Sequence, residues 1–294
     1  VYIIILNYNG RRWLENCLTT LSKTLYENYR VLVVDNASTD GSLEIVRGRF
    51  PDLEVIENRL NLGFSEGNNI GIRSALGNNP DYVILLNPDT KVEPEWLAEI
   101  VTAARSDERI GILGAVQLEY DTNELNSWTR NAAKQHLEEL SMPESARRVL
   151  PMEWVEGAWL AVKREVFEAI GLLDPIYFAF YEEIDLCRRA CCHGFQVGLA
   201  TRSGVHDYRG GSWEVDSKMK RERDYRCDRS QFIYASTDPR RTLANNLYWY
   251  AITLGTKLKA HAKAFSLAGV VNLARMQIEL LFSVVRRRDV KGVR

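Results

Sequence analysis

Apolar stretches of strand length alternate with amphipathic segments of helix length through the first 120 residues. Tyr2–Asn7 is a nearly continuous apolar run, which is typical of a strand buried on both faces of a sheet. Strands that alternate with helices of this length predict βαβ units, so we expect an α/β fold whose mainly parallel sheet is flanked by helices. The expected strands span 2–7, 29–34, 53–56, 82–86 and 110–118, and the expected helices span 13–21, 38–50, 65–75 and 95–104.

The pattern changes after residue 120. Residues 121–152 are mostly polar and predict a short helix near 132–140. Beyond them we expect strands at 154–162 and 196–200, and helices at 163–170, at 182–193 and from 243 onward. The predicted organisation is a domain of residues 1–240, with halves 1–120 and 121–240, followed by a helical C-terminal extension, 241–294.

The composition is that of an ordinary globular protein, with 46% hydrophobic and 26% charged residues in a chain of 294. The formal net charge of −1 gives no bias toward polyanions, so we expect no nucleic-acid partner. The five cysteines form no Cys-x-x-Cys pair, and their odd number argues against a secreted disulfide framework and favours the cytoplasm. No signal peptide and no apolar run of about 18 residues is visible, so we expect no membrane-spanning helix.

Polar residues gather where the expected strands end. Taken singly, each group is typical of a turn. Because ligands of such sheets bind beyond the carboxyl ends of the strands, the groups together predict one polar crevice. The candidate ligand-binding residues are Asn7, Asn9, Asp35, Asn36, Asn61, Gly63, Asn68, Asn87 and Asp89.

The residue types in this crevice predict a nucleotide held together with a divalent metal ion. Asp35 can accept hydrogen bonds from a base N–H or a ribose hydroxyl, and Asp89 is a hard oxygen ligand suited to Mg²⁺ or Mn²⁺. The sequence contains no Gly-x-x-x-x-Gly-Lys-Ser/Thr motif, and no Gly-x-Gly-x-x-Gly follows the first strand. A metal would therefore neutralise the phosphates, which favours a nucleoside diphosphate leaving group over ATP hydrolysis or hydride transfer.

Three acids, Glu182, Glu183 and Asp185, open the helix expected at 182–193. Acids in a first helical turn can complement the helix dipole. Like charges this close also raise one pKa, which suits one of the three to general-base catalysis. His206 follows a later strand and is a candidate metal ligand, with a capped surface position or a core position as the alternatives.

Several short motifs, taken in order, resemble the family 2 glycosyltransferases, most closely their rhamnosyltransferase-like bacterial branch. The resemblance extends from residue 1 to about 210. It implies a GT-A fold, in which a Rossmann-like sheet merges donor and acceptor halves, and an inverting, divalent-metal-dependent transfer from a nucleotide sugar. The matching segments are 4–9 (IILNYN), 33–42 (VVDNASTDGS), 61–71, 85–89 (LLNPD), 156–158 (EGA), 164–165, 171–174 (GLLD) and 182–186 (EEIDL).

The resemblance also implies roles for individual residues. Asp35 would bind the nucleotide base. Asn87-Pro88-Asp89 stands where the family has its Asp-x-Asp motif, so that Asp89 would bind the metal and Asn87 the ribose or the sugar. His206 would be a further metal ligand, and Glu183 aligns with the catalytic base. The family usually has Glu-Asp where this chain has Glu182-Glu183, which leaves the base open among Glu182, Glu183 and Asp185.

The resemblance favours dTDP-rhamnose as the donor and a growing lipid-linked surface polysaccharide as the acceptor. Two alternatives stay open. A sugar nucleotidyltransferase would share the sheet type and the metal, but Asn9-Gly10-Arg11-Arg12 is a poor substitute for its Gly-rich basic loop. A non-catalytic glycan-binding or scaffold protein could also retain the fold.

The C-terminal extension is basic and amphipathic. Residues 257–294 hold nine Lys or Arg against two acids, a net charge of +7 that leaves −8 on residues 1–256. Leu273, Met276, Leu280, Leu281 and Val284 recur at helical spacing before the run 286–288 of three arginines. Two interpretations stay open: a helix that packs on its own domain or on a second subunit, and a helix on the inner face of an anionic membrane. Trp249 and Tyr250 suit either one.

Overall fold

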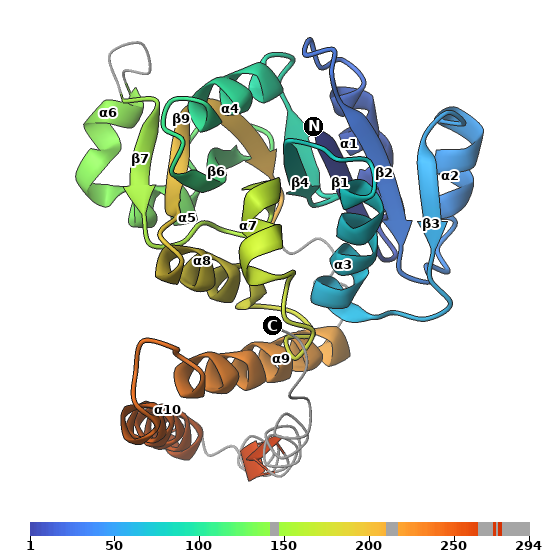
Figure 1. Cartoon of the computed structure of the whole chain (residues 1–294). Coiled ribbons are helices and arrows are strands. Elements are labelled where there is room, and N and C mark those ends of the chain that lie inside the picture. The colour runs from blue at the N-terminus through green and yellow to red at the C-terminus, as the bar shows by residue number, and fades with distance from the viewer. Residues whose placement is uncertain (142–146, 210–216, 264–272, 275, 278–294) are drawn as a thin grey trace.

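The computed structural model describes residues 1–141, 147–209, 217–263, 273–274 and 276–277 (Figure 1). These residues form a nine-stranded sheet of order β3-β2-β1-β4-β8-β6-β9-β5, with β7 paired to β9. The strands are β1 (Tyr2–Asn7), β2 (Arg30–Asp35), β3 (Glu54–Glu57), β4 (Tyr82–Leu86), β5 (Thr90–Val92), β6 (Ile110–Glu119), β7 (Val149–Met152), β8 (Trp159–Lys163) and β9 (Gln196–Asp207). The helices are α1 (Arg11–Leu21), α2 (Ser42–Arg49), α3 (Gly63–Leu76), α4 (Trp96–Ala104), α5 (Ser127–Ala132), α6 (Leu137–Ser141), α7 (Arg164–Ile170), α8 (Glu182–Cys192), α9 (Ser217–Ser236) and α10 (Leu243–Lys263).

The predicted α/β class is confirmed, and the direction of the strands fixes where a ligand can bind. β3, β2, β1 and β4 are parallel neighbours, as are β6 and β9. β8 joins the two groups and pairs antiparallel with both β4 and β6, so all six of these strands point the same way. The sheet is parallel in its amino-terminal half and mixed beyond it. Six carboxyl ends therefore share one edge.

Alternate residues of β1 serve two different cores, which explains its continuous apolar run. Ile3 and Ile5 pack with α1 and α4 on one face of the sheet, and Ile4 packs with α3, α7 and α8 on the other. All three isoleucines are fully buried. Helices cover both faces of the sheet (Figure 1), so the molecule has the three-layer architecture that the sequence predicts.

The structure adds elements that apolar periodicity did not reveal. β5 and β7 are short, and β9 continues to Asp207 across a register shift, well past the expected end at residue 200. The expected helix at 132–140 is divided into α5 and α6 around a 3₁₀ turn, and the strand expected at 154–162 begins at Trp159.

The C-terminal helices stand apart from the sheet (Figure 1). Charged residues fill most of the first half of α9, so its helical character was not visible as an apolar stripe. It is held by a small cluster of its Phe232 and Ile233 with Tyr177, Leu273 and Met276. The helix expected from residue 243 is confirmed as α10, whereas residues 280–288 of the predicted basic amphipathic segment lie outside the described residues. Among the described helices, none combines the length and the apolar character needed to cross a membrane.

Candidate active site

A cavity of about 470 Å³ lies at the edge of the sheet where the parallel strands end. This volume lies within the range of small-molecule sites. The ends of β1 and β4, the segment before β8, the start of α8, the end of β9 and one side of α9 line it. Of the residues singled out from the sequence, those that line it are Asn36, Asn61, Gly63, Asn87, Asp89, Glu182 and Glu183. Those outside its described lining are Asn7, Asn9, Asp35, Asn68, Asp185 and His206.

Asp35 ends its strand on a charge because it organises the turn that follows. It is 3% exposed, its Oδ1 accepts a 2.9 Å hydrogen bond from Asn7 Nδ2, and its Oδ2 accepts one of 2.9 Å from the Ser38 backbone N–H. The same Asn7 amide also lies within hydrogen-bond distance of two serine hydroxyls in the turn. Asn9 Oδ1 accepts from the Thr39 N–H at 2.8 Å. These side chains shape the turn, and the cavity wall is formed by their neighbour Asn36.

A polar network joins the two halves of the site. Asn36 Nδ2 donates to Asn61 Oδ1 and to the Gly63 carbonyl, both at 3.0 Å. The backbone N–H of the following residue, Phe64, donates to the Phe178 carbonyl at 2.6 Å. Gly63 has a φ of +79°, and a Cβ there would lie 2.4 Å from the same carbonyl, so the position requires glycine. Asn68 lies one turn further along α3, where its Nδ2 donates a 2.9 Å hydrogen bond to the Phe64 carbonyl.

Two aspartates meet at the opposite side of the cavity. β5 follows Asp89 directly and pairs antiparallel with β9, with Thr90 opposite Asp207. Both aspartates line the cavity and are about 95% buried or more. Burial, and then the neighbouring Asp89 charge, raise the pKa of Asp207 to about 8. Asn87 also lines the cavity, and its backbone N–H donates to the Ala158 carbonyl at 2.9 Å.

His206 is not among the described residues that line the cavity. Successive residues of a strand point to opposite faces, so His206 faces away when Asp207 faces the cavity. Its Nδ1 lies 3.1 Å from the Glu119 carbonyl oxygen and its Nε2 lies 3.3 Å from Glu93 Oε1. Asp207 therefore stands where the sequence reading expected His206. The alternation of β9 shows that only one of these two neighbours can face the cavity, and the register of the strand decides which one.

The paired aspartates fit a divalent cation. Their oxygens are hard donors, and two carboxylates held together in a buried site repel each other unless a cation or a proton lies between them. Within the described residues, no three His, Cys, Asp or Glu side chains cluster around one point. A cation held by Asp89 and Asp207 would thus keep positions for ligand oxygens, which is how Mg²⁺ and Mn²⁺ commonly bind phosphates.

The start of α8 separates the three acids found in the sequence. Glu182 and Glu183 point into the cavity. Asp185 does not, because its Oδ1 accepts from Arg188 at 2.6 Å and its Oδ2 accepts from Arg189 at 2.7 Å. Both ion pairs are largely buried, so Asp185 holds the helix in place and two candidates remain for the base.

The remaining two candidates lie among unsatisfied oxygens. Burial raises the pKa of Glu183 to about 7; backbone N–H groups oppose the shift and the Glu156 charge adds to it. Burial, and then Glu183, raise the pKa of Glu182 well above its ordinary value. Among the described residues, Oε2 of Glu156, Glu182 and Glu183 finds no hydrogen-bond partner. Arg209 pairs with the Glu156 carboxylate at 3.1 Å.

The backbone just before α8 is strained. Phe180 and Tyr181 have φ values of 70° and 71°, two consecutive left-handed residues that are not glycine. Such conformations cost roughly 1–3 kcal/mol each and concentrate at functional sites. Neither these residues nor Glu156 was assigned a role from the sequence. The EGA motif was visible, but it did not show that Glu156 would lie beside Glu183.

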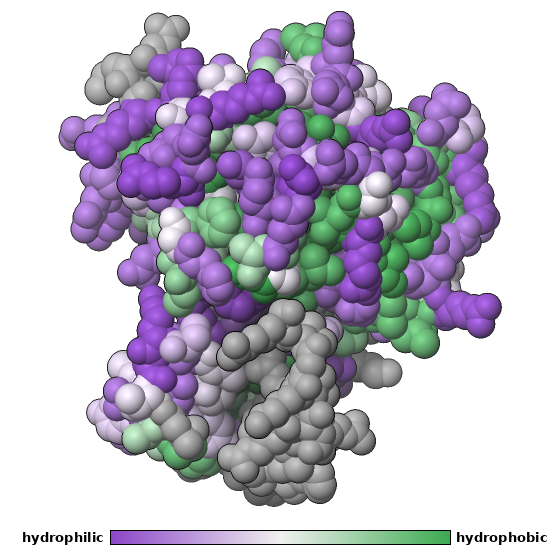
Figure 2. Space-filling model, in the orientation of Figure 1, coloured by the Kyte–Doolittle hydropathy of each residue, from purple (hydrophilic) through white to green (hydrophobic). Residues whose placement is uncertain are grey.

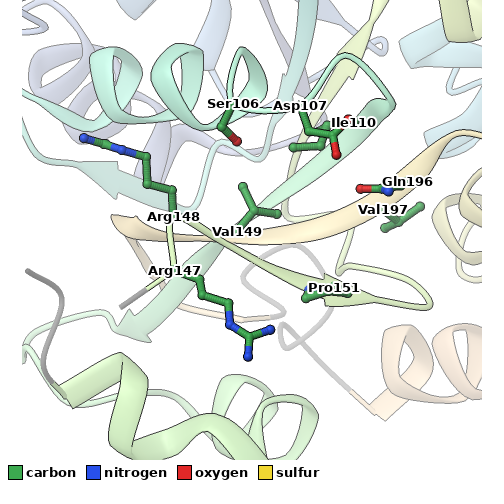
Figure 3. A pocket seen from close by; sticks show the side chains of 9 residues that line it. All are labelled: Ser106, Asp107, Ile110, Arg147, Arg148, Val149, Pro151, Gln196 and Val197. Atoms are coloured by element: carbon green, nitrogen blue, oxygen red, sulfur yellow. The ribbon is translucent and has the colours of Figure 1, made fainter. Parts of the chain in front are cut away.

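A second cavity, of about 370 Å³, lies at the amino-terminal ends of β6 and β9 (Figure 3). The side chains of Arg147 and Arg148 extend in opposite directions, so the two guanidinium groups do not converge on it (Figure 3). Arg148 pairs with Glu99 at 3.1 Å. The strands end at the other edge of the sheet, which leaves the acidic cavity as the candidate site.

The chain is similar in sequence to known glycosyltransferases. A model of the family described as "Glycosyl transferase family 2" matches residues 2–171. The low-salt glycan biosynthesis hexosyltransferase Agl10 of Haloferax volcanii is 29% identical over 200 residues, which is 67% of this chain and 63% of that protein. The N-acetylglucosaminyl-diphospho-decaprenol L-rhamnosyltransferase of Mycobacterium tuberculosis is 26% identical over 63% of this chain and 68% of that protein. The chain thus spans about two thirds of the length of these relatives.

The fold is shared with a solved mannosyltransferase. The enzyme PcManGT from Pyrobaculum calidifontis, in complex with GDP-Man and Mn²⁺, superposes with a TM-score of 0.60 at 20% identity, over 97% of this chain and 81% of that one. At this identity the likeness shows the fold alone. It confirms the GT-A architecture that the sequence predicts.

Proposed function

Because this chain belongs to glycosyl transferase family 2, we propose that it moves a sugar from a nucleotide diphosphate sugar to an acceptor hydroxyl, with inversion at the anomeric carbon. One observation supports this most directly. The buried carboxyl of Glu183, with its pKa raised to about 7, shares one cavity with Asp89 and Asp207. A base that titrates near neutral pH suits the removal of a proton from a hydroxyl.

In this proposal Glu183 is the general base. Its Oε2 has no hydrogen-bond partner among the described residues and belongs to a side chain that lines the cavity. An acceptor hydroxyl placed there donates its proton to Glu183 as its oxygen attacks. A single displacement, with the nucleoside diphosphate leaving from the opposite side, inverts the anomeric centre.

Glu182 takes a different role from its neighbour. It is 4% exposed, and burial followed by the Glu183 charge raises its pKa well above the ordinary value, which favours the protonated form. A protonated carboxyl donates a hydrogen bond as well as accepting one. We therefore assign Glu182 to orienting a sugar hydroxyl. This division answers, as a proposal, which acid of the Glu-Glu pair is the base.

Asp89 and Asp207 would hold a Mg²⁺ or Mn²⁺ ion, as their chemistry and the Mn²⁺ of the superposed mannosyltransferase suggest. When bound, the ion stabilises the negative charge that develops on the leaving diphosphate. Asn61 and Asn87 line the neighbouring wall and would supply amide groups for the rest of the donor. Asn36 shapes that wall, because its own amide is engaged with Asn61 and Gly63. Asp35 and Asn7 position that wall from behind it.

The donor sugar and the acceptor are proposed from the relatives. The mycobacterial relative is named for L-rhamnose transfer to a diphospho-decaprenol glycolipid. We propose dTDP-rhamnose as the donor and a lipid-linked glycan of surface polysaccharide synthesis as the acceptor.

The test is a donor screen with purified full-length chain, Mn²⁺ or Mg²⁺, and a panel of dTDP-, UDP- and GDP-sugars. Release of nucleoside diphosphate is the readout. We expect metal-dependent release from one donor. Silence across the panel, with no donor bound in calorimetry, would contradict the proposed activity and favour a non-catalytic scaffold.

A further inference from the structure

The inner face of α10 is packed against α9. Asn246 Nδ2 donates to the Asp238 carbonyl at 3.1 Å, the ring of Tyr250 lies 5.4 Å from that of Phe232, and Lys257 pairs with Asp228. The positions 246, 250 and 257 recur at helical spacing and so define one face of the helix. The opposite face of α10 is turned away from α9.

That opposite face is apolar and open. Seven large hydrophobic residues are exposed in the described parts of the chain, and five of them lie on α10. They are Leu247 at 58%, Tyr248 at 61%, Trp249 at 43%, Ile252 at 39% and Leu258 at 42%. Figure 2 shows hydrophobic residues reaching the surface at this lower end of the molecule, where α10 lies in Figure 1. Gathered apolar exposure of this kind marks an interaction site.

The C-terminal part of the chain, to which this face belongs, has a net positive charge. The sequence of α10 contains three lysines and no Asp or Glu. Residues 217–294 hold 17 Lys and Arg against six acids, a formal charge of +11, whereas residues 1–216 carry −12. The net charges of the two parts of the chain therefore have opposite signs, and the apolar face of α10 belongs to the positive part.

We propose that the outer face of α10 docks on the surface of an anionic phospholipid bilayer, with the helix lying in the plane of the interface. A helix with an apolar exposed face, an exposed lysine (Lys259) on that face and no acids is the kind that binds such surfaces. Tyr248 and Trp249 are residues that favour the headgroup region. A second copy of the chain fits less well, because it would bring two segments of +11 together.

The docking would set the position of the cavity relative to the membrane. α9 lies between the sheet domain and α10 (Figure 1), and its Met219 and Arg223 line the cavity. A bilayer beneath α10 would therefore lie on the α9 side of the site. The surface is inferred independently of the proposed transfer reaction, because it rests on exposure and charge alone.

Vesicle flotation with the full chain tests this proposal. We expect the chain to float with phosphatidylcholine vesicles that contain phosphatidylglycerol, to float less as salt is raised, and to remain behind with phosphatidylcholine alone. The triple variant Leu247→Ser, Tyr248→Ser, Ile252→Ser should reduce the partition coefficient at least about tenfold. Leu25→Ser removes a side chain that is 66% exposed outside the C-terminal helices and serves as the matched control.

Two further measurements keep the outcome decisive. Lys259→Glu adds a negative charge to the exposed face and should also lower flotation, even if the triple variant proves poorly folded by circular dichroism. Flotation that is absent, or that is equal in the wild type and both α10 variants, would overturn the proposal. A dimer in light scattering that the triple variant abolishes, without any flotation of the wild type, would overturn it in favour of a second copy.

Discussion

Replacing Glu183 by glutamine should separate activity from stability. The glutamine resembles the protonated carboxyl in size and charge but cannot accept a proton at neutral pH. If Glu183 is the base, Glu183→Gln should lower kcat by about 10²–10⁴-fold, the usual contribution of a general base. In the wild type, activity should fall as the pH drops below about 7, because the carboxyl then becomes protonated.

The same substitution should stabilise the folded chain at alkaline pH. The Glu183 carboxyl has a pKa of 4.5 when unperturbed and of about 7 in the folded chain. The folded state therefore binds this proton more tightly, and the stability it provides is present below pH 4.5 and lost as the pH rises through 7. Each pKa unit between the folded and unfolded values corresponds to about 1.4 kcal/mol of unfolding free energy. Because the side chain lines an open cavity, solvent reduces the expected difference to about 2–3 kcal/mol.

Urea denaturation without metal, at pH 4 and pH 8, measures this difference. We expect the free energy of unfolding of Glu183→Gln to match the wild type at the lower pH and to exceed it by about 2–3 kcal/mol at the higher one. Glu44→Gln, at an exposed position of α2, is the control and should show no such change. Near-normal turnover of Glu183→Gln would refute its role as the base. Equal stability at pH 8 would refute the burial argument.

Four further substitutions address the rest of the site. Mn²⁺ should raise the unfolding temperature of the wild type and of His206→Gln but not of Asp207→Asn in scanning fluorimetry, and the reverse ranking would return the metal to the histidine. Asp185→Asn should lower the free energy of unfolding by about 3–5 kcal/mol, since it leaves buried guanidinium groups without their carboxylate, and an unchanged urea midpoint would contradict this. Gly63→Ala should destabilise the chain by about 1–3 kcal/mol and weaken nucleotide binding in calorimetry, because its Cβ would meet the Phe178 carbonyl. Nucleotide affinity equal to that of the wild type in Gly63→Ala would show that binding does not depend on the close contact between Gly63 and Phe178.

The sequence was most informative where local pattern and tertiary structure agree. The continuous apolar run of β1 predicts a strand buried on both faces, and β1 does contact one hydrophobic core on each face of the sheet. The Asn and Asp residues at strand ends were expected at one edge, and Asn36, Asn61, Asn87 and Asp89 do line one cavity there. The fold rule for parallel sheets was enough to place them.

Which side chains face the cavity could not be derived from the sequence. Whether His206 or its neighbour faces the cavity depends on the register of β9, which includes a shift that no motif encodes. Asp185 looked equivalent to Glu182 and Glu183 until Arg188 and Arg189 were seen to engage it. Partners of that kind decide which acid is free for chemistry, and they come from packing rather than from spacing.

The helix that carries the proposed base is tied to the C-terminal part of the chain. Arg188 binds Asp185 with one nitrogen and donates to the Tyr234 carbonyl at 3.0 Å with another, while its guanidinium lies over the Tyr234 ring at 4.1 Å. The family model ends at residue 171, yet this tether reaches the end of α9. A fragment cut to the matched region would therefore lose both α8 and its anchor. Truncation before residue 217 would leave Glu183 on a helix whose far support is missing, so we expect the proposed activity to require the chain at least through α9.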